Sequence, residues 1–343
     1  MKVAILRKPR EIIIEERPIP KIARDEVLVR IRASGICGSD IHGFHGKIPE
    51  RRPPGIIVGH EAAGEVADVG AEAGSFKVGD RVAINPLIPC RECYSCRRGW
   101  FHLCDAMITL GSAMRVFHDG AMCEYLALPY RQLHFLPSGV SYEAGALAEP
   151  AGNAIHLLNR GTLEIGSTIA VFGTGAVGLM VVQTARLFGA SKVIAVDINP
   201  FRLGKAKELG ADVAVNASER NPVEIIMQET DGQGVDMAVE AAGFTATYHQ
   251  CAEVLRKRGT VIALGFMDPE VTLPMRNIIY RELSIIGSTA FTYEIETVLS
   301  LFATGELNDK PLITHTFPLE AAQKAFETAA DPESKAIKVM IVP

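Results

Sequence analysis

The fold is indicated most clearly by residues 168–178, which read TIAVFGTGAVG. The uncharged, β-rich run over 168–172 predicts a buried strand, and the residues after it fit the pattern G-x-G-x-x-G. Apolar residues then recur at helical spacing, and Lys192–Asp197 has the character of a second strand. A strand, a glycine-rich turn and a helix, followed by a strand that ends in an acidic residue, are typical of a dinucleotide-binding βαβ unit.

The turn predicts a cofactor site in which backbone amides at a helix N-terminus bind a pyrophosphate. We expect Asp197 to accept hydrogen bonds from the adenosine ribose, which favours NAD over NADP. Arg202 stacks on the adenine or binds a 2′-phosphate, so NADP stays the alternative, and a flavodoxin-like turn without a dinucleotide is another. The turn residues of the predicted site are Gly173, Gly175, Val177 and Gly178.

Outward from this unit, the sequence divides into two domains. From Glu149-Pro150 onward, strands and helices alternate, which predicts an α/β domain with a parallel sheet over 151–288. Residues 1–150 instead carry short β-branched runs separated by Gly and Pro, at 27–31, 56–58 and 81–84. After Gly287, we expect two helices and a final strand over 337–342. Periodicity does not decide to which of the two domains this C-terminal tail belongs.

Length and composition agree with two packed domains. The chain has 343 residues, of which 48% are hydrophobic, and its net charge is 35 − 40 = −5 without any run of five like charges, so a nucleic-acid partner is not expected. Residues 165–185 carry no charge and are long enough to span a bilayer, but their glycine pattern favours the nucleotide turn over a membrane span. No export signal is recognisable at residues 1–8, so we expect a cytoplasmic protein.

Four of the seven cysteines lie within fifteen residues, in the pattern C-x2-C-x2-C-x7-C. In a reducing compartment this spacing favours thiolate ligands over disulfides. Four thiolates leave a tetrahedral zinc no open position, so the zinc would be structural, and an iron–sulfur cluster is the alternative. The predicted ligands, in a lobe over about 86–106, are Cys90, Cys93, Cys96 and Cys104.

A second set of candidate ligands is scattered along the first domain. Cys37 lies in a glycine-flanked turn, His60-Glu61 follows an apolar run, and Glu149 precedes Pro150, which disfavours a helix at Glu149. One Cys, one His and one carboxylate make a zinc site with an open fourth position, as catalysis requires. Glu61 and Glu149 both qualify as the third ligand; we favour Glu149 at rest, with Glu61 beside the metal.

Together these motifs resemble the zinc-dependent medium-chain alcohol and polyol dehydrogenases, over essentially the whole chain. The resemblance implies a GroES-like β-barrel catalytic domain, formed by residues 1–150 and 289–343, and a doubly wound Rossmann NAD-binding domain over 151–288. It also implies an active site between the domains, a homodimer or homotetramer, and two zinc ions, one catalytic and one structural. Residues 82–86, 111–114 and 118–120 look most like L-idonate and sorbitol dehydrogenases, whereas 149–156 and 312–318 look more like threonine dehydrogenases.

The resemblance implies oxidation of a secondary alcohol of polyol or sugar-acid type to the ketone, with hydride transfer to NAD⁺. Ser39 would take the hydroxyl proton and pass it, through the nicotinamide ribose, to His42, whose ordinary pKa lies near neutrality. The polyol branch often carries an Arg after the Gly-Ser of the last Rossmann strand, but residues 287–291, GSTAF, have none. Alternatives are an L-threonine 3-dehydrogenase, a zinc-free quinone-reductase-like relative and a regulatory NAD-binding protein.

Overall fold

The computed structural model describes residues 1–265, 268 and 270–343. Contacts divide the chain into two compact units, residues 1–149 with 295–343 and residues 150–294. The segment 289–294, expected in the first domain, lies with the second unit. It is held there because Phe291 is buried against Gly152 and because the Glu294 carboxylate lies 2.7 Å from His156 Nδ1.

The first unit is built on a seven-stranded sheet in the order β16-β17-β3-β4-β5-β9, with β8 paired to β3. A separate hairpin joins β1 (Lys2–Lys8) to β2 (Glu11–Glu16). The helices of this unit are α1 (Gly38–Phe44), α2 (Tyr142–Ala146), α9 (Glu294–Thr304) and α10 (Ala322–Ala330). The sheet strands are β3 (Glu26–Gly35), β4 (Glu61–Val69), β5 (Arg81–Ile84), β8 (Tyr125–Pro129), β9 (Leu133–Phe135), β16 (Ile313–Pro318) and β17 (Lys338–Val342).

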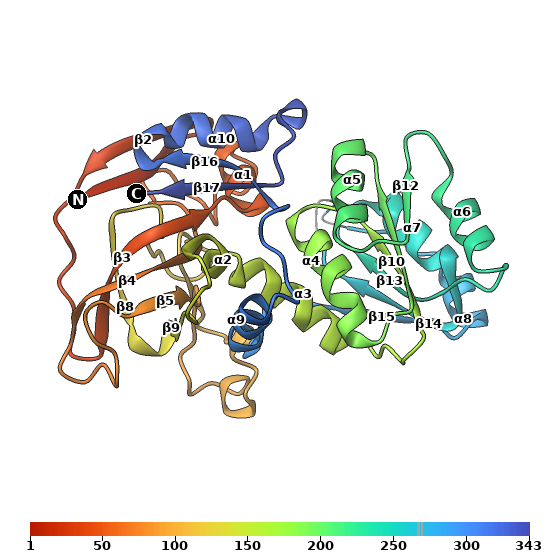
Figure 1. The fold of residues 1–343 in the computed structure, drawn as a ribbon, viewed down its shortest axis with the longest axis horizontal. Helices are drawn as coiled ribbons and strands as arrows, with labels where there is room; N and C mark the ends of the chain where they lie inside the picture. The colour runs from red at the N-terminus through yellow and green to blue at the C-terminus, as the bar shows by residue number, and fades with distance from the viewer. Residues whose placement is uncertain (266–267, 269) are drawn as a thin grey trace. The chain divides into compact units, whose positions relative to one another are not determined.

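The strand β3 positions the chain that leads to Cys37. Its alternate residues Val27, Val29 and Ile31 are almost completely buried and anchor one apolar core. β17 pairs antiparallel with the end of β3, so the C-terminal tail lies in this sheet, as the blue strands beside the red ones show in Figure 1. The predicted strands over 27–31, 81–84 and 337–342 correspond to β3, β5 and β17.

The strand predicted over residues 56–58 is wrong. All three residues are at least 97% buried, but only Ile57 makes a β-bridge, to Ile5. Gly55 and Gly59 flank them with φ of +90° and +94°, a left-handed conformation that is not that of a strand, so the backbone hydrogen bonds to residues 4–6 and 120–122 do not extend into a regular ladder. The apolar, β-branched composition of this run therefore indicates that it is buried, but it does not show that it forms a strand.

The second unit contains a six-stranded parallel sheet in the order β12-β11-β10-β13-β14-β15. The strands predicted over 168–172, 192–197 and 235–240 have these bounds in the structure. The strands are β10 (Thr168–Phe172), β11 (Lys192–Asp197), β12 (Val213–Asn216), β13 (Val235–Glu240), β14 (Leu255–Ala263) and β15 (Ser284–Gly287). The helices are α3 (Ala148–Arg160), α4 (Ala176–Ala185), α5 (Pro200–Glu208), α6 (Pro222–Glu229), α7 (Thr245–Val254) and α8 (Met275–Tyr280).

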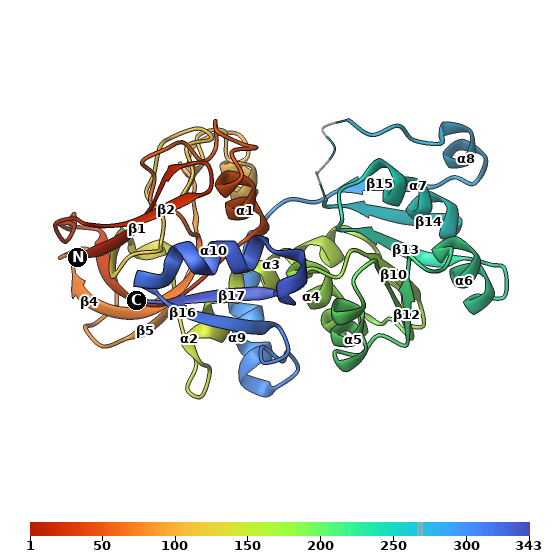
Figure 2. The same cartoon turned by 90° about the horizontal axis from the view of Figure 1, so that it is seen from above.

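Counted from β10, this strand order is 3-2-1-4-5-6, the order of doubly wound nucleotide-binding sheets. Helices α4 and α5 cover one face, and α6 and α7 cover the other (Figure 2). The expected start of α5 is confirmed, because the Asn199 side chain accepts hydrogen bonds from the first-turn amides of Phe201 and Arg202. The strand order reverses between β10 and β13, because successive strands are added on one side of β10 and then on the other. Such sheets bind ligands at the carboxyl ends of the strands at that point. In the described part of the chain, no helix is both long enough and apolar enough to cross a bilayer.

Candidate functional site

The first candidate site gathers Cys37, His60 and Glu61, whose ligand atoms all lie within 4.8 Å of one another. Cys37 is the N-cap of α1, while His60 and Glu61 stand at the start of β4. Gly35 faces Glu61 across the sheet, and a Cβ there would overlap the Glu61 carboxylate. Thiolate, imidazole and carboxylate are a donor set that zinc accepts, and three ligands leave a position for substrate, so these residues fit the metal.

Two charged residues that the sequence analysis did not single out surround His60. Asp40 is 1% exposed; its Oδ2 accepts from the Cys37 amide at 3.1 Å, and its Oδ1 lies 3.4 Å from His60 Nδ1. Arg52 is 4% exposed and donates to Asp40 Oδ1 at 3.1 Å. Burial would raise the pKa of Asp40, but His60 and Arg52 hold it well below its usual range. Neighbouring carboxylates of this kind orient a histidine that binds a metal.

A buried ammonium lies against Glu61. Lys338, the first residue of β17, places Nζ 2.6 Å from both Glu61 carboxylate oxygens and 3.2 Å from the Ile36 carbonyl. Burial alone would lower the pKa of Lys338, but the charges of Glu61, Cys37 and Glu149 raise it. In the sequence, Lys338 opens an apolar strand some 280 residues from its partner, so no local pattern marks it.

Glu149 lies in a helix, contrary to the prediction from Pro150. Both residues belong to the first turn of α3, where backbone amides have no partner one turn earlier, so proline is tolerated. The charge of Glu149 acts on Lys338, but its carboxylate is not a member of the Cys37, His60 and Glu61 group. Its assignment as the resting third ligand stays a prediction.

The proposed relay residues Ser39 and His42 both lie on α1, the helix that Cys37 begins. Ser39 Oγ accepts a hydrogen bond from Arg52 Nη2 at 3.2 Å. His42 occupies the last turn and is half-buried; burial and the charges of Lys47 and His45 lower its pKa below 6.5. The lowered pKa favours the neutral form of His42, which can accept a proton.

The four clustered cysteines form the second candidate site, between the short strands β6 (Leu87–Ile88) and β7 (Ile108–Thr109). Two of the Sγ–Sγ distances, Cys90–Cys96 and Cys93–Cys104, are 4.0 Å. A tetrahedron with zinc–sulfur bonds of about 2.3 Å has edges of about 3.8 Å, so the thiols are already arranged for a closed site.

Backbone hydrogen bonds and burial act in opposite directions on the thiols of this lobe. Hydrogen bonds from the amides of Cys96 and Asp105 lower the pKa of Cys93 to about 6, whereas burial raises that of Cys96 to about 12. Metal binding must therefore displace protons from the buried members of the set. In the same lobe, the Arg98 guanidinium stacks 3.6 Å from the Tyr94 ring centroid.

In the second unit, the glycine-rich turn follows β10 and opens α4. Gly173 has φ +93°, and a Cβ there would lie 2.8 Å from the Ala242 amide nitrogen, so only glycine fits this crossing of two loops. A Cβ on Gly178 would overlap the Gly173 carbonyl, whereas Gly175, the N-cap of α4, has open space around its Cα, and Val177 lies in the first turn. The open space at Gly175 lies at the N-terminus of α4, where the first backbone amides of a helix can donate to a pyrophosphate.

Asp197 ends β11 beside this turn. Its Oδ2 accepts from the Thr174 amide at 2.6 Å and the Thr174 hydroxyl at 2.8 Å, and its Oδ1 accepts from the Asn199 amide at 2.9 Å. The carboxylate is thereby fixed at the carboxyl edge of the sheet, where a ribose would lie. In the described part of the chain, Arg202 Nε is buried and has no hydrogen-bond partner.

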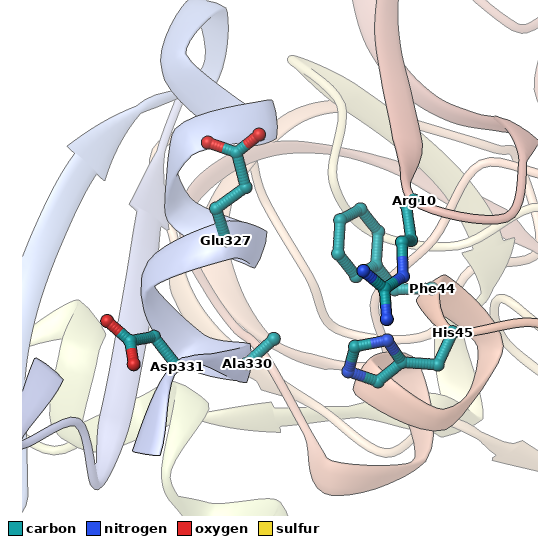
Figure 3. Close-up of a pocket in the computed structure, with 6 residues that line it drawn as sticks. All are labelled: Arg10, Phe44, His45, Glu327, Ala330 and Asp331. Carbon is teal, nitrogen blue, oxygen red and sulfur yellow. The ribbon is translucent and has the colours of Figure 1, made fainter. Parts of the chain in front are cut away.

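A surface pocket lies in the first unit (Figure 3). Arg10, Phe44 and His45 form one wall, and Glu327, Ala330 and Asp331 from the end of α10 form the other. Arg10, Glu327 and Asp331 are exposed, and none of the predicted ligand, relay or cofactor residues lines the pocket. The candidate site is therefore the Cys37, His60 and Glu61 group rather than this hollow.

Comparisons with known proteins agree with this geometry. Residues 23–138 match the alcohol dehydrogenase GroES-like domain, and residues 176–304 match the zinc-binding dehydrogenase model. The chain is 37% identical to sorbitol dehydrogenase of Bacillus subtilis, with 100% of this chain and 97% of the relative covered.

Two solved structures are similar over the whole chain. The alcohol dehydrogenase TADH from Thermus sp. ATN1 has a TM-score of 0.93 at 34% identity, covering 100% of this chain and 99% of its own. L-idonate 5-dehydrogenase of Escherichia coli has a TM-score of 0.92 at 30% identity, covering 100% and 98%. The expected GroES-like and Rossmann architecture is thereby confirmed, and the chain belongs to the family of zinc-binding dehydrogenases.

Proposed function

We propose that this chain is a zinc-dependent dehydrogenase that oxidises a secondary alcohol of polyol or sugar-acid type to the ketone, with NAD⁺ as hydride acceptor. One observation carries the proposal: the chain has two separate metal-ligand groups, the three-ligand group of Cys37, His60 and Glu61 and a closed group of four cysteines. A closed site serves structure, whereas a site with three protein ligands leaves room for a substrate oxygen. Glu149 is the alternative third ligand.

When bound, zinc supplies Lewis acidity to the substrate oxygen and NAD⁺ takes the hydride. The chain itself removes the proton. Ser39 Oγ accepts it from the substrate hydroxyl and releases its own hydrogen toward His42, which is half-buried at the end of α1 and whose lowered pKa favours the neutral form. His42 then delivers the proton to water. One alcohol thus loses a hydride and a proton and becomes a ketone.

The predicted preference for NAD rests on the position of Asp197. Its carboxylate is held by the Thr174 and Asn199 amides at the carboxyl edge of β11. A 2′-phosphate beside it would meet like charge, whereas ribose hydroxyls would donate to it. Arg202, with its buried Nε, is the residue that would support the opposite preference for NADP.

The polyol or sugar-acid substrate class is supported by the relatives that are named sorbitol dehydrogenase and L-idonate 5-dehydrogenase. Purified protein with measured zinc content is offered polyols, aldonates and amino-alcohols, and NADH formation is followed. We expect the highest kcat/KM with a polyol or an aldonate. The highest value with L-threonine would support the amino-alcohol alternative, and no NADH from any alcohol, together with absent zinc, would support the quinone-reductase-like alternative.

We also propose that the chain forms a homodimer or homotetramer. β15 is one of the two edge strands of the six-stranded sheet, and Ile285 on it is 38% exposed. Exposed apolar residues continue on α8, where Ile279 is 65% and Tyr280 74% exposed. An apolar sheet edge of this kind favours pairing with another strand. Light scattering of the parent and of Ile285→Lys tests this, since the variant should dissociate.

We place the protein in the cytoplasm, because its metal-ligand thiols require a reducing compartment. The four clustered thiols lie at metal-binding distances, and all seven cysteines are free. Fractionation of cells that express the tagged chain tests this placement, and recovery from an oxidising compartment would contradict it.

A further inference from the structure

A buried guanidinium connects the metal-ligand group to the proposed proton path. Arg52 lies in the segment between α1 and β4 and is 4% exposed. Its Nε donates to Asp40 Oδ1 at 3.1 Å, and its Nη2 donates to Ser39 Oγ at 3.2 Å and lies 3.4 Å from His60 Nδ1. One planar group therefore touches the serine of the relay and the residues that orient the histidine ligand.

The fold makes space for this side chain. A Cβ at Gly43, on α1, would lie 2.5 Å from Arg52 Cγ and 2.6 Å from Arg52 Cβ. The Arg52 amide also donates to the Ile48 carbonyl at 2.9 Å, which fixes the backbone from which the side chain extends. The aliphatic stem thus packs against the glycine face of the helix that carries Ser39, and the guanidinium turns inward.

The chemistry of the guanidinium sets the orientation of the Ser39 hydroxyl. Arginine only donates, and it stays charged at every pH at which the protein is folded. Ser39 Oγ must therefore accept from Arg52, and the Ser39 hydrogen points to another acceptor. A positive charge that donates to this oxygen also stabilises negative charge developing on it, an effect that burial strengthens.

We propose that Arg52 is a positioning residue for proton removal, which holds Ser39 Oγ in place and stabilises it while the substrate proton is transferred. The proposal rests on the proposed function, because it assumes that Ser39 accepts this proton. In the step, the original Ser39 hydrogen moves toward His42 ahead of the substrate proton, so negative charge develops on Ser39 Oγ beside Arg52; the substrate O–H bond then breaks as a new Ser39 O–H bond forms. No electrons are exchanged in this transfer.

Arg52→Lys tests the proposal, because lysine keeps the charge but loses the two-pronged geometry that reaches Asp40 and Ser39 together. We expect kcat at pH 7 to fall about ten- to a hundredfold, at or below the low end for general acid–base groups, with KM nearly unchanged. The loss should shrink as pH rises, because hydroxide then replaces the relay. Arg32→Lys, which alters the half-buried pair with Glu65 in the same unit, is the matched control and should keep the parent kcat.

A double-mutant cycle separates the proposal from a structural role. If Arg52 acts through Ser39, Arg52→Lys should cost less than about twofold in kcat in the Ser39→Ala background, with zinc content and melting temperature close to those of Ser39→Ala. An equal fold-loss in both backgrounds, or a loss that follows zinc content, would overturn the proposal. The function itself would still stand if the parent forms NADH from an alcohol, and would fail if it does not.

If Arg52→Lys does not fold, Gly43→Ala provides the second measurement. The added methyl displaces the Arg52 stem while leaving the charge in the chain. We expect the loss of kcat in Gly43→Ala to depend on Ser39 and on pH in the same way. A loss of kcat that is equal in the Ser39→Ala background and at every pH would overturn the proposal.

Discussion

Replacing Lys338 by methionine should destabilise the zinc-free protein strongly. The substitution keeps an apolar stem of similar length but removes the ammonium that lies 2.6 Å from both Glu61 oxygens. The side chains of Lys338 and Glu61 are 3% and 1% exposed, so water cannot replace the lost partner. Removing one member of a buried ion pair costs about 3–5 kcal/mol, because the other charge stays buried without compensation.

The cost translates into a measurable melting temperature. At about 2–4 °C per kcal/mol for a unit of this size, Lys338→Met should melt about 6–20 °C below the parent in the presence of a zinc chelator. Added zinc should reduce the difference, because a bound cation beside Glu61 restores a positive partner. Differential scanning calorimetry with chelator and with zinc gives both numbers.

The control is the double variant Lys338→Met/Glu61→Gln. Removing both charges should recover most of the stability, since neutral replacement of a buried pair is often tolerated. The explanation fails if Lys338→Met melts with the parent in chelator, or if the double variant melts lower than the single one.

Three further changes test other parts of the chain. Cys93→Ser opens the closed cysteine site, so we expect loss of one zinc and a lower melting temperature; a variant that loses activity alone, at parent stability, would contradict a structural role. Asp197→Ser should raise KM for NAD⁺ and improve relative use of NADP⁺, since each charged hydrogen bond is worth about 1.5–3 kcal/mol, and an unchanged cofactor preference would remove Asp197 from the site. His42→Ala should lower kcat near neutral pH and less at high pH, and a pH-independent loss would argue against the relay. Because burial lowers the pKa of His42, the parent should keep its kcat to a more acidic pH than a histidine of ordinary pKa would allow.

The sequence predicted those features that short motifs encode locally. The turn at Gly173, the cap at Asn199 and the cluster that begins at Cys90 depend on residues close in the chain, so their spacing carries the geometry. Lys338 and Arg52 could not be predicted, because they are charged residues whose burial depends on partners brought together by the fold.

Two local expectations failed because packing outweighed them. Pro150 did not exclude Glu149 from α3, since the first turn of a helix needs no amide donor. Residues 56–58 have strand composition, yet between two left-handed glycines they make a single β-bridge and backbone hydrogen bonds to residues 4–6 and 120–122, without forming a regular strand. The composition of such a run predicts that it is buried. Whether it pairs as a regular strand depends on neighbouring segments from elsewhere in the chain.

The central claim is that Cys37 belongs to a catalytic metal site distinct from the four-cysteine site. Zinc content and NADH formation, measured on the same samples of the parent and of Cys37→Ser, test it most directly. We predict two zinc ions per chain in the parent, one for each ligand group. Cys37→Ser should keep one zinc, the fold and NAD binding, and form no NADH; a variant that retains both zinc ions and a kcat near that of the parent would contradict the claim.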